Sequence, residues 1–268
     1  MMNPYTTLRA KLQRPLFVPF AVLGYPNEKT SLEVIEALIK GGADALELGI
    51  PFSDPPADGP IIQAADTAAI AAGITPKICF SLIKKIRETC LPVGRNIPFP
   101  IGILTYFNIV FVRGIDRFYA DCKASGVDSV LVADLPLEHL EEVAAAAKKN
   151  GIAVVSIISE VTTDERLREI KKYAGGYLYA VSYLGVTGAE KNAGSSQLSD
   201  LIKRSKKIVD LPVIVGFGIS TPEHVRRTAE SGADGVIVGS RLVAGVQKRE
   251  NLQTLCSDLK APLLEEAR

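Results

Sequence analysis

The sequence predicts a closed (β/α)8 barrel, and three observations support this prediction. Short runs rich in Leu and β-branched residues alternate with helical patterns along the 268 residues. A Gly-Ala/Val-Asp boundary recurs before three of the strands, at 42–44, 126–128 and 232–234. The richest glycine segments follow the last three strands, whereas an open doubly wound sheet more often has its glycines after the first strand. We therefore expect one (β/α)8 barrel domain over residues 1–268, with an N-terminal helix included.

The elements follow from hydrophobic periodicity and from start and stop signals. The expected strands are 17–23, 45–49, 101–105, 129–133, 153–158, 177–181, 213–216 and 235–238. The expected helices are 29–40, 76–89, 115–125, 137–150, 164–173, 197–207, 222–231 and 252–267. Thr163 and Thr221 are N-cap residues ahead of acidic first turns, and Gly41, Gly126 and Gly151 mark helix ends.

Composition excludes several classes of function. The net charge is +1 with 23% charged residues, which argues against a general nucleic-acid binder or a polybasic membrane binder. No run approaches 18 apolar residues and the first 15 residues lack the apolar core of a secretory signal, so we expect a cytoplasmic protein. Cys79, Cys90, Cys122 and Cys256 form no CxxC pair, and His139 and His224 are the only histidines, which argues against a zinc site.

The chemistry of such a barrel is expected at the carboxyl ends of the strands. No Lys lies at a predicted strand end, which argues against a Schiff-base aldolase, and no His lies there, which argues against a metal-dependent one. No Ser or Cys with a neighbouring His indicates acyl transfer. Carboxylates, a tyrosine and a group of glycine-rich turns remain.

These glycine-rich turns predict a phosphate site. Segments 185–188 (GVTG), 216–220 (GFGIS) and 239–240 (GS) follow the sixth, seventh and eighth strands. Glycine lets backbone N–H groups approach an anion closely, and a short helix beginning near Ser240 would direct its N-terminus at the same anion. The alternative is that the three segments are only tight turns.

Two carboxylates are the candidate catalytic groups. Period-two alternation puts Glu47 on one face with Ala45 and Gly49, so we expect it to point into the barrel. An apolar site would raise its pKa and suit it to proton transfer near pH 7; the alternative is a buried carboxylate paired with a cation. Asp58 lies in the Pro-rich loop after the second strand, where it either caps a turn or shares the chemistry with Glu47.

The segment ALELGIPFSDPPADGPIIQAA (residues 45–65) resembles the signature LELGxPFSDPxADGPxIQ of the tryptophan synthase alpha chain family. The similarity continues in barrel order through FVPF, TYFN, SVLVADLP, GVTG, GFGIS and VGSR. It covers nearly the whole chain and includes both carboxylates at the spacing of the family.

The resemblance implies a lyase that cleaves indole-3-glycerol phosphate by a retro-aldol reaction to indole and glyceraldehyde 3-phosphate. Glu47 would be the acid and base, and Asp58 would hold the indole N–H and stabilise the cationic intermediate. The implied substrate-binding residues are Phe20, Leu104, Leu131, Tyr179, Thr187 and Phe217. The implied phosphate-binding residues are Gly188, Gly218, Gly239 and Ser240.

The resemblance also implies a partner, a beta chain that uses pyridoxal phosphate (PLP) and receives indole in an α2β2 assembly. This chain itself would need no metal and no cofactor. The loop with Asp54 and Pro55 and the TYFN segment would belong to the interface, and Asp134 resembles a residue that orders a loop.

Three departures from the family pattern leave alternatives open. The family usually has Asp at the position of Tyr25 and Pro at the position of Ile109. At the position of Pro56 it commonly has Leu or a similar residue. A free-standing lyase that releases indole would turn over rapidly without a partner. A regulatory subunit that only activates a beta chain would release no glyceraldehyde 3-phosphate.

Overall fold

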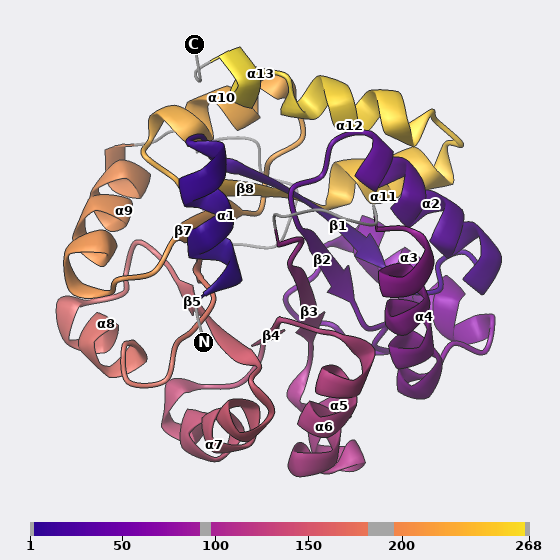
Figure 1. Ribbon diagram of the computed structural model, residues 1–268, viewed down its shortest axis with the longest axis horizontal. Helices are drawn as coiled ribbons and strands as arrows, with labels where there is room; N and C mark the ends of the chain where they lie inside the picture. The colour runs from indigo at the N-terminus through magenta and orange to yellow at the C-terminus, as the bar shows by residue number, and fades with distance from the viewer. Residues whose placement is uncertain (1–2, 92–97, 182–195, 266–268) are drawn as a thin grey trace.

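The computed structural model describes residues 3–91, 98–181 and 196–265. Eight parallel strands close into a barrel in chain order, and β1 pairs with β8 to complete it (Figure 1). The predicted fold class is therefore confirmed. The strands are β1 (Leu16–Val22), β2 (Leu46–Gly49), β3 (Ile101–Thr105), β4 (Ser129–Val132), β5 (Ala153–Ile158), β6 (Leu178–Val181), β7 (Val213–Gly216) and β8 (Gly235–Val238).

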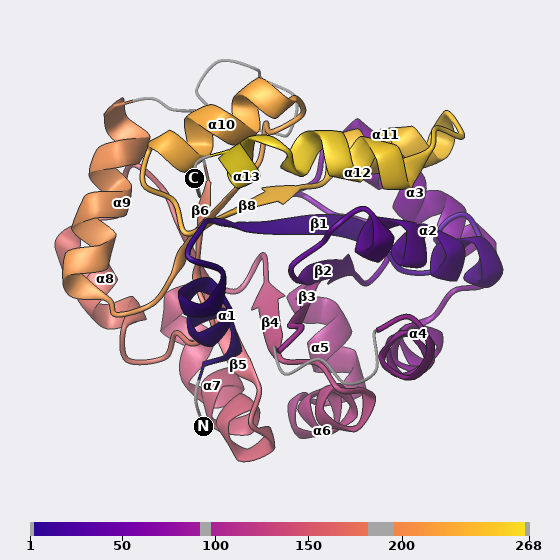
Figure 2. The ribbon, with the colours of Figure 1, turned by 45° about the horizontal axis from the view of Figure 1, so that its top comes forward.

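The helices surround these strands, as Figures 1 and 2 show from two directions. In order they are α1 (Pro4–Leu12), α2 (Glu28–Lys40), α3 (Pro60–Ala71), α4 (Pro76–Thr89), α5 (Phe107–Arg113), α6 (Ile115–Ser125), the 3-10 turn η1 (Leu137–His139), α7 (Leu140–Asn150), α8 (Asp164–Ile170), α9 (Ser196–Ile208), α10 (Pro222–Glu230), α11 (Ser240–Gln247), α12 (Leu252–Lys260) and α13 (Pro262–Glu265). The predicted helix 137–150 is divided into η1 and α7. The predicted helix 252–267 is interrupted at Pro262, which cannot donate a backbone hydrogen bond within a helix and begins α13 instead.

Two helices, α3 and α5, are absent from the sequence prediction. Helix α3 follows the Pro-rich loop after β2, and α5 begins directly after β3, where the sequence pattern predicts loops. Pro60 occupies the first turn of α3, where its missing N–H costs nothing, so the residue that marks the loop also starts the helix. The short helix expected near Ser240 is present as α11.

The recurring Gly-x-Asp boundary has a structural role at the end of the barrel where the strands begin. Each of its aspartates accepts a hydrogen bond from the backbone N–H of a neighbouring strand: Phe17 to Asp44 (2.8 Å), Ile101 to Asp128 (2.8 Å) and Val213 to Asp234 (2.9 Å). Each also pairs with a cation: Arg14 and Lys260 with Asp44, Arg87 with Asp128, and Lys206 with Asp234. The repeat therefore holds strand register away from the site of chemistry.

The same end of the barrel is closed by α1, which lies in front of the strands near the centre of Figure 1. Tyr5 of this helix is 1% exposed, and its hydroxyl lies 2.8 Å from Ser129 Oγ. Its ring packs on Tyr177, with 4.8 Å between the ring centroids. Within the described ranges, α1 thus covers the barrel interior at the strand starts.

No single helix in the described ranges is long and apolar enough to cross a membrane; α3 and α4, bent by 101°, pass that test only as a pair. Within the same ranges, no group of three His, Cys, Asp or Glu side chains is arranged to hold a metal ion. The four cysteines are free thiols, and Cys79, Cys122 and Cys256 are buried.

Candidate active site

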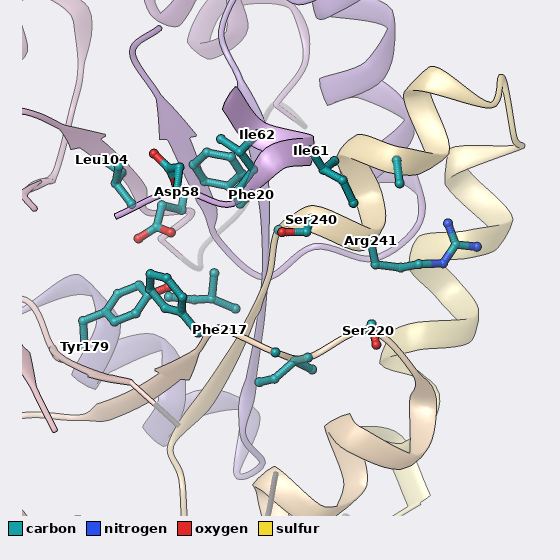
Figure 3. A pocket seen from close by; sticks show the side chains of 16 residues that line it. Phe20, Asp58, Ile61, Ile62, Leu104, Tyr179, Phe217, Ser220, Ser240 and Arg241 are labelled. Atoms are coloured by element: carbon teal, nitrogen blue, oxygen red, sulfur yellow. The ribbon is translucent and has the colours of Figure 1, made fainter. Parts of the chain in front are cut away.

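A cavity of about 260 Å³ lies at the carboxyl ends of the strands (Figure 3). Strands β1, β2, β3, β6 and β8 contribute to its wall, together with the β2–α3 loop, the loop after β7, and helices α3 and α11. The predicted site residues that line it are Phe20, Glu47, Asp58, Leu104, Tyr179, Phe217, Gly218, Gly239 and Ser240. The barrel therefore brings together residues that are as much as 220 positions apart in the sequence.

Glu47 points into this cavity from the middle of β2. Register pairs it with Phe20 of β1 and Gly102 of β3, and its side chain is almost fully buried. The Tyr177 hydroxyl donates a hydrogen bond of 2.9 Å to Glu47 Oε1. Burial raises the pKa of Glu47 to about 7, the Tyr177 hydrogen bond opposes that rise, and the nearby Asp58 carboxylate adds to it.

No ion pair involves Glu47 among the residues that the structure describes. The alternative of a carboxylate neutralised by a cation therefore finds no partner in these parts of the chain. The group is instead solvated by one tyrosine hydroxyl in an apolar environment. This is the environment in which a carboxyl group exchanges protons near neutral pH.

Asp58 reaches the same cavity from the β2–α3 loop and is 5% exposed. The Tyr106 hydroxyl donates to Asp58 Oδ2 at 2.6 Å, and the Gln63 amide donates to the Asp58 carbonyl at 2.7 Å. Phe52 stacks on the Tyr106 ring with 5.0 Å between centroids. These hydrogen bonds hold the Asp58 carboxylate in a defined position. Burial raises the pKa of Asp58 above its ordinary value, and the hydrogen bond from Tyr106 opposes that rise.

The remaining wall near the carboxylates is apolar and aromatic. Phe20, Leu104, Tyr179 and Phe217 lie around the space into which Asp58 points (Figure 3). Tyr179 and Phe217 meet edge to face, with 5.8 Å between centroids. A Cβ atom at Gly216 would overlap the Tyr179 hydroxyl, so only glycine allows this approach.

Leu131 does not line this cavity, contrary to the expectation from the resemblance. It is 2% exposed and pairs with Leu104 of β3 and Val155 of β5. Because side-chain layers fill the interior of such a barrel, Leu131 is packed there and Leu104 forms this side of the wall. Two further predicted residues, Thr187 and Gly188, lie outside the described residues.

The opposite end of the cavity has the features of an anion site. Gly218 and Ser220 follow β7, and Gly239 and Ser240 join β8 to α11, whose first turn borders the cavity. The backbone N–H groups of a first helical turn lack acceptors within the helix, and the helix dipole favours a negative ligand there. The two carboxylates and this anion site thus face a single space.

Several residues around the site were not singled out from the sequence. Tyr106 and Tyr177 hold the two carboxylates, and Arg241 lines the cavity beside Ser240. Asp66 of α3 is 4% exposed, and burial raises its pKa to about 8, with Asp58 nearby adding to the rise. The signal that could have found Asp66 is a single acidic residue within the apolar helix sequence IIQAADTAAIA.

Comparison with known proteins agrees with this geometry. The family model described as "Tryptophan synthase alpha chain" matches residues 7–265. The chain belongs to the tryptophan synthase alpha chain family. The alpha chain of Methanoregula boonei is 46% identical over 248 residues, which cover 92% of this chain and 91% of the relative.

Solved structures of the alpha-chain family superpose on nearly the whole chain. The tryptophan synthase subunit alpha of Legionella pneumophila gives a TM-score of 0.85 at 30% identity and covers 99% of this chain and 100% of its own. A chain of the tryptophan synthase complex from Pyrococcus furiosus gives a TM-score of 0.80 at 35% identity, covering 93% and 98%. Membership of this family makes the protein a lyase that cleaves indole-3-glycerol phosphate.

Proposed function

We propose that the cavity cleaves indole-3-glycerol phosphate by a retro-aldol reaction, with Glu47 as the proton-transfer group and Asp58 as the electrostatic partner. The observation that carries this proposal is the placement of two buried carboxylates in one apolar cavity that ends at an anion site. The substrate has the matching order of parts: an aromatic ring, a reacting carbon–carbon bond and a phosphate.

Glu47 is suited to both proton transfers. The bond can break only when indole leaves as a neutral ring, so C3 of the ring must first be protonated. With a pKa of about 7, Glu47 is protonated in a large fraction of molecules at neutral pH and can donate to C3. The carboxylate that remains accepts the proton of the glycerol hydroxyl, and the Tyr177 hydroxyl stabilises it in that state.

Asp58 has a different task because its surroundings differ. Protonation of C3 places positive charge on the ring nitrogen, and a carboxylate beside the N–H stabilises that charge in a cavity of low dielectric. Tyr106 holds Asp58 by a hydrogen bond of 2.6 Å, so little reorganisation is needed when the charge develops. The wall formed by Phe20, Leu104 and Phe217 excludes water around the ring.

The phosphate binds at the turns after β7 and β8, and this binding fixes the register of the substrate. Backbone N–H groups near Gly218, Gly239 and Ser240 are the donors. Binding energy from this remote group orients the reacting bond between the two carboxylates. By the same proposal the chain uses no cofactor of its own.

We further propose that the chain works with a beta chain in an α2β2 assembly, and that PLP belongs to that partner. On α5, directly after the TYFN motif, the side chains of Phe111 and Val112 are 66% and 76% exposed. Asp134 Oδ1 accepts a hydrogen bond of 2.6 Å from the backbone N–H of Phe107, which fixes the start of this helix. Exposed apolar side chains on an ordered helix are typical of a protein interface.

One assay tests both proposals. Release of glyceraldehyde 3-phosphate from indole-3-glycerol phosphate is measured for the purified chain, with and without a beta chain. Activity that rises on adding the beta chain supports the complete proposal. Rapid turnover that the beta chain leaves unchanged supports a free-standing lyase, and no release in either case supports a regulatory subunit.

The variant Glu47→Gln tests the role of the carboxyl group. We expect cleavage to be lost while the binding of inorganic phosphate persists, because Gln keeps the shape but cannot exchange a proton with the substrate. Near-normal turnover in this variant would contradict the assignment. The binding measurement separates loss of chemistry from loss of fold.

A further inference from the structure

The cavity has more acidic than basic side chains in its wall, although its substrate carries a phosphate. Its wall contains the carboxyl groups of Glu47 and Asp58, and Arg241 is the only Lys or Arg among the described residues that line it. A phosphate monoester brings a charge between −1 and −2 near neutral pH, since its second pKa is about 6. The charge of this one arginine therefore matters more than that of an ordinary surface cation.

Arg241 lies at the phosphate end of the cavity. It is the second residue of α11 and directly follows Ser240, whose hydroxyl lies at the start of the same helix. Figure 3 shows the side chain of Arg241 leaving the wall near Ser240 and extending away from Asp58. The flexible stem thus connects the anion site with the molecular surface.

At the surface, the guanidinium is held by Glu250. Arg241 Nη2 donates to Glu250 Oε2 at 2.6 Å, and Nη1 donates to Oε1 at 3.2 Å. The two side chains are 29% and 31% exposed. Arg241 and, to a smaller extent, Lys248 lower the pKa of Glu250, so this carboxyl group is charged at neutral pH.

A partly exposed ion pair of this kind contributes little to stability. A phosphate dianion offers the same guanidinium more charge and more acceptor oxygens than one carboxylate does. Exchange of Glu250 for phosphate therefore costs little and leaves no charge buried without a partner, because Glu250 keeps access to water.

We propose that Arg241 is a phosphate-binding residue for the substrate. Its guanidinium pairs with Glu250 when the site is empty, and it exchanges Glu250 for the phosphate when the substrate binds. The inference rests on the proposed function, since it assigns the phosphate to the β7–β8 end of the cavity. Arg241 binds the phosphate and takes no part in the proton transfers at Glu47.

Phosphate binding by Arg241 affects KM for phosphorylated substrates and no other kinetic constant. The phosphate is remote from the bond that breaks, so its contact with Arg241 is equally strong in the ground state and the transition state. Loss of the arginine charge then raises KM for phosphorylated substrates and leaves kcat unchanged. Indole carries no phosphate, so its KM in the reverse condensation with glyceraldehyde 3-phosphate is an internal control.

The experiment compares wild type, Arg241→Met, Glu250→Gln and the double variant in the condensation of indole with glyceraldehyde 3-phosphate. Met keeps most of the stem and removes the charge, and Gln keeps the size of Glu250. Arg241→Met is expected to raise KM for glyceraldehyde 3-phosphate by about three- to tenfold, with kcat and KM for indole within about twofold. The increase should shrink between about 50 mM and about 500 mM NaCl because salt screens partly exposed charges.

Glu250→Gln is expected to act in the opposite direction. It releases the guanidinium and lowers KM for glyceraldehyde 3-phosphate by about two- to fivefold, and the double variant resembles Arg241→Met. A purely structural pair predicts instead that both single variants raise both KM values together. That result, or an unchanged KM for glyceraldehyde 3-phosphate in Arg241→Met, would overturn the proposal.

Calorimetric titration with glycerol 3-phosphate, using glycerol as the uncharged control, separates this inference from the proposed function. Weaker binding of glycerol 3-phosphate to Arg241→Met supports the arginine role even if wild type shows no condensation, in which case the proposed function alone fails. Equal binding to wild type and to Arg241→Met refutes the arginine role whatever the activity.

Discussion

Replacing Tyr177 by Phe removes one hydroxyl from the catalytic carboxyl group and leaves most of the packing in place. The hydroxyl donates to Glu47 Oε1 at 2.9 Å, and the ring that packs on Tyr5 is kept. The hydrogen bond favours the ionised form of Glu47, so its removal raises the pKa of that group further above its ordinary value.

The magnitude follows from the energy of the hydrogen bond. A hydrogen bond to a charged acceptor contributes about 1.5–3 kcal/mol, and one pKa unit corresponds to about 1.4 kcal/mol. We therefore expect the pKa of Glu47 to rise from about 7 by roughly one to two units. Because the first step needs the protonated acid, the alkaline limb of the kcat/KM profile moves to higher pH by the same number of pH units.

The assay is the pH profile of kcat/KM for indole-3-glycerol phosphate cleavage, which reports on the free enzyme. Titration of the substrate phosphate is identical for both proteins and cancels in the comparison. Tyr119→Phe is the matched control, because the Tyr119 hydroxyl is buried and has no hydrogen-bond partner within the described part of the chain. An alkaline limb that stays in place or moves to lower pH in Tyr177→Phe would refute the reasoning.

Further predictions concern three aspartates. Asp58→Asn should lower kcat for cleavage by at least about 100-fold, because it removes charge beside the developing cation, and a loss below about tenfold would mean that the carboxylate only shapes the loop. Asp66→Asn should stabilise the fold by about 1–3 kcal/mol at pH 7–8 and little near pH 4 in urea unfolding. The sign follows because the pKa of Asp66 is about 8 in the folded state and near 3.8 when unfolded. Between these values the folded state binds more protons, so the stability of the wild type falls as pH rises. Equal stabilisation by Asp66→Asn at both pH values would contradict this prediction. Asp128→Ala should destabilise the fold by about 1–3 kcal/mol in the same assay, because the Arg87 guanidinium loses its carboxylate partner and the Ile101 N–H loses its acceptor; an unchanged midpoint would exclude the register role.

Local patterns in the sequence predict much of this architecture. The bounds of β3, β5, β7 and β8 agree with those expected from periodicity, since buried parallel strands produce short apolar runs with clear ends. The inward direction of Glu47 also follows locally, because side chains alternate along a strand and this residue shares a face with Ala45 and Gly49. Helices α3 and α5 were missed because their first residues, Pro60 and Phe107, follow loop-like motifs directly.

Depth in the barrel and long-range partners are not local properties. The resemblance implies that both Leu104 and Leu131 line the substrate site, but only the packed layers show that Leu104 lines the cavity and Leu131 does not. Tyr177 and Glu47 are separated by 130 positions and Tyr106 and Asp58 by 48, so their hydrogen bonds exist only after strand register and closure bring them together. The amino-acid order is therefore sufficient for the choice of elements and the facing of Glu47, because these depend on neighbours along the chain. The pKa values of the Glu47 and Asp58 carboxyl groups and the position of Arg241 depend on burial and on contacts across the barrel. These are properties of the closed fold.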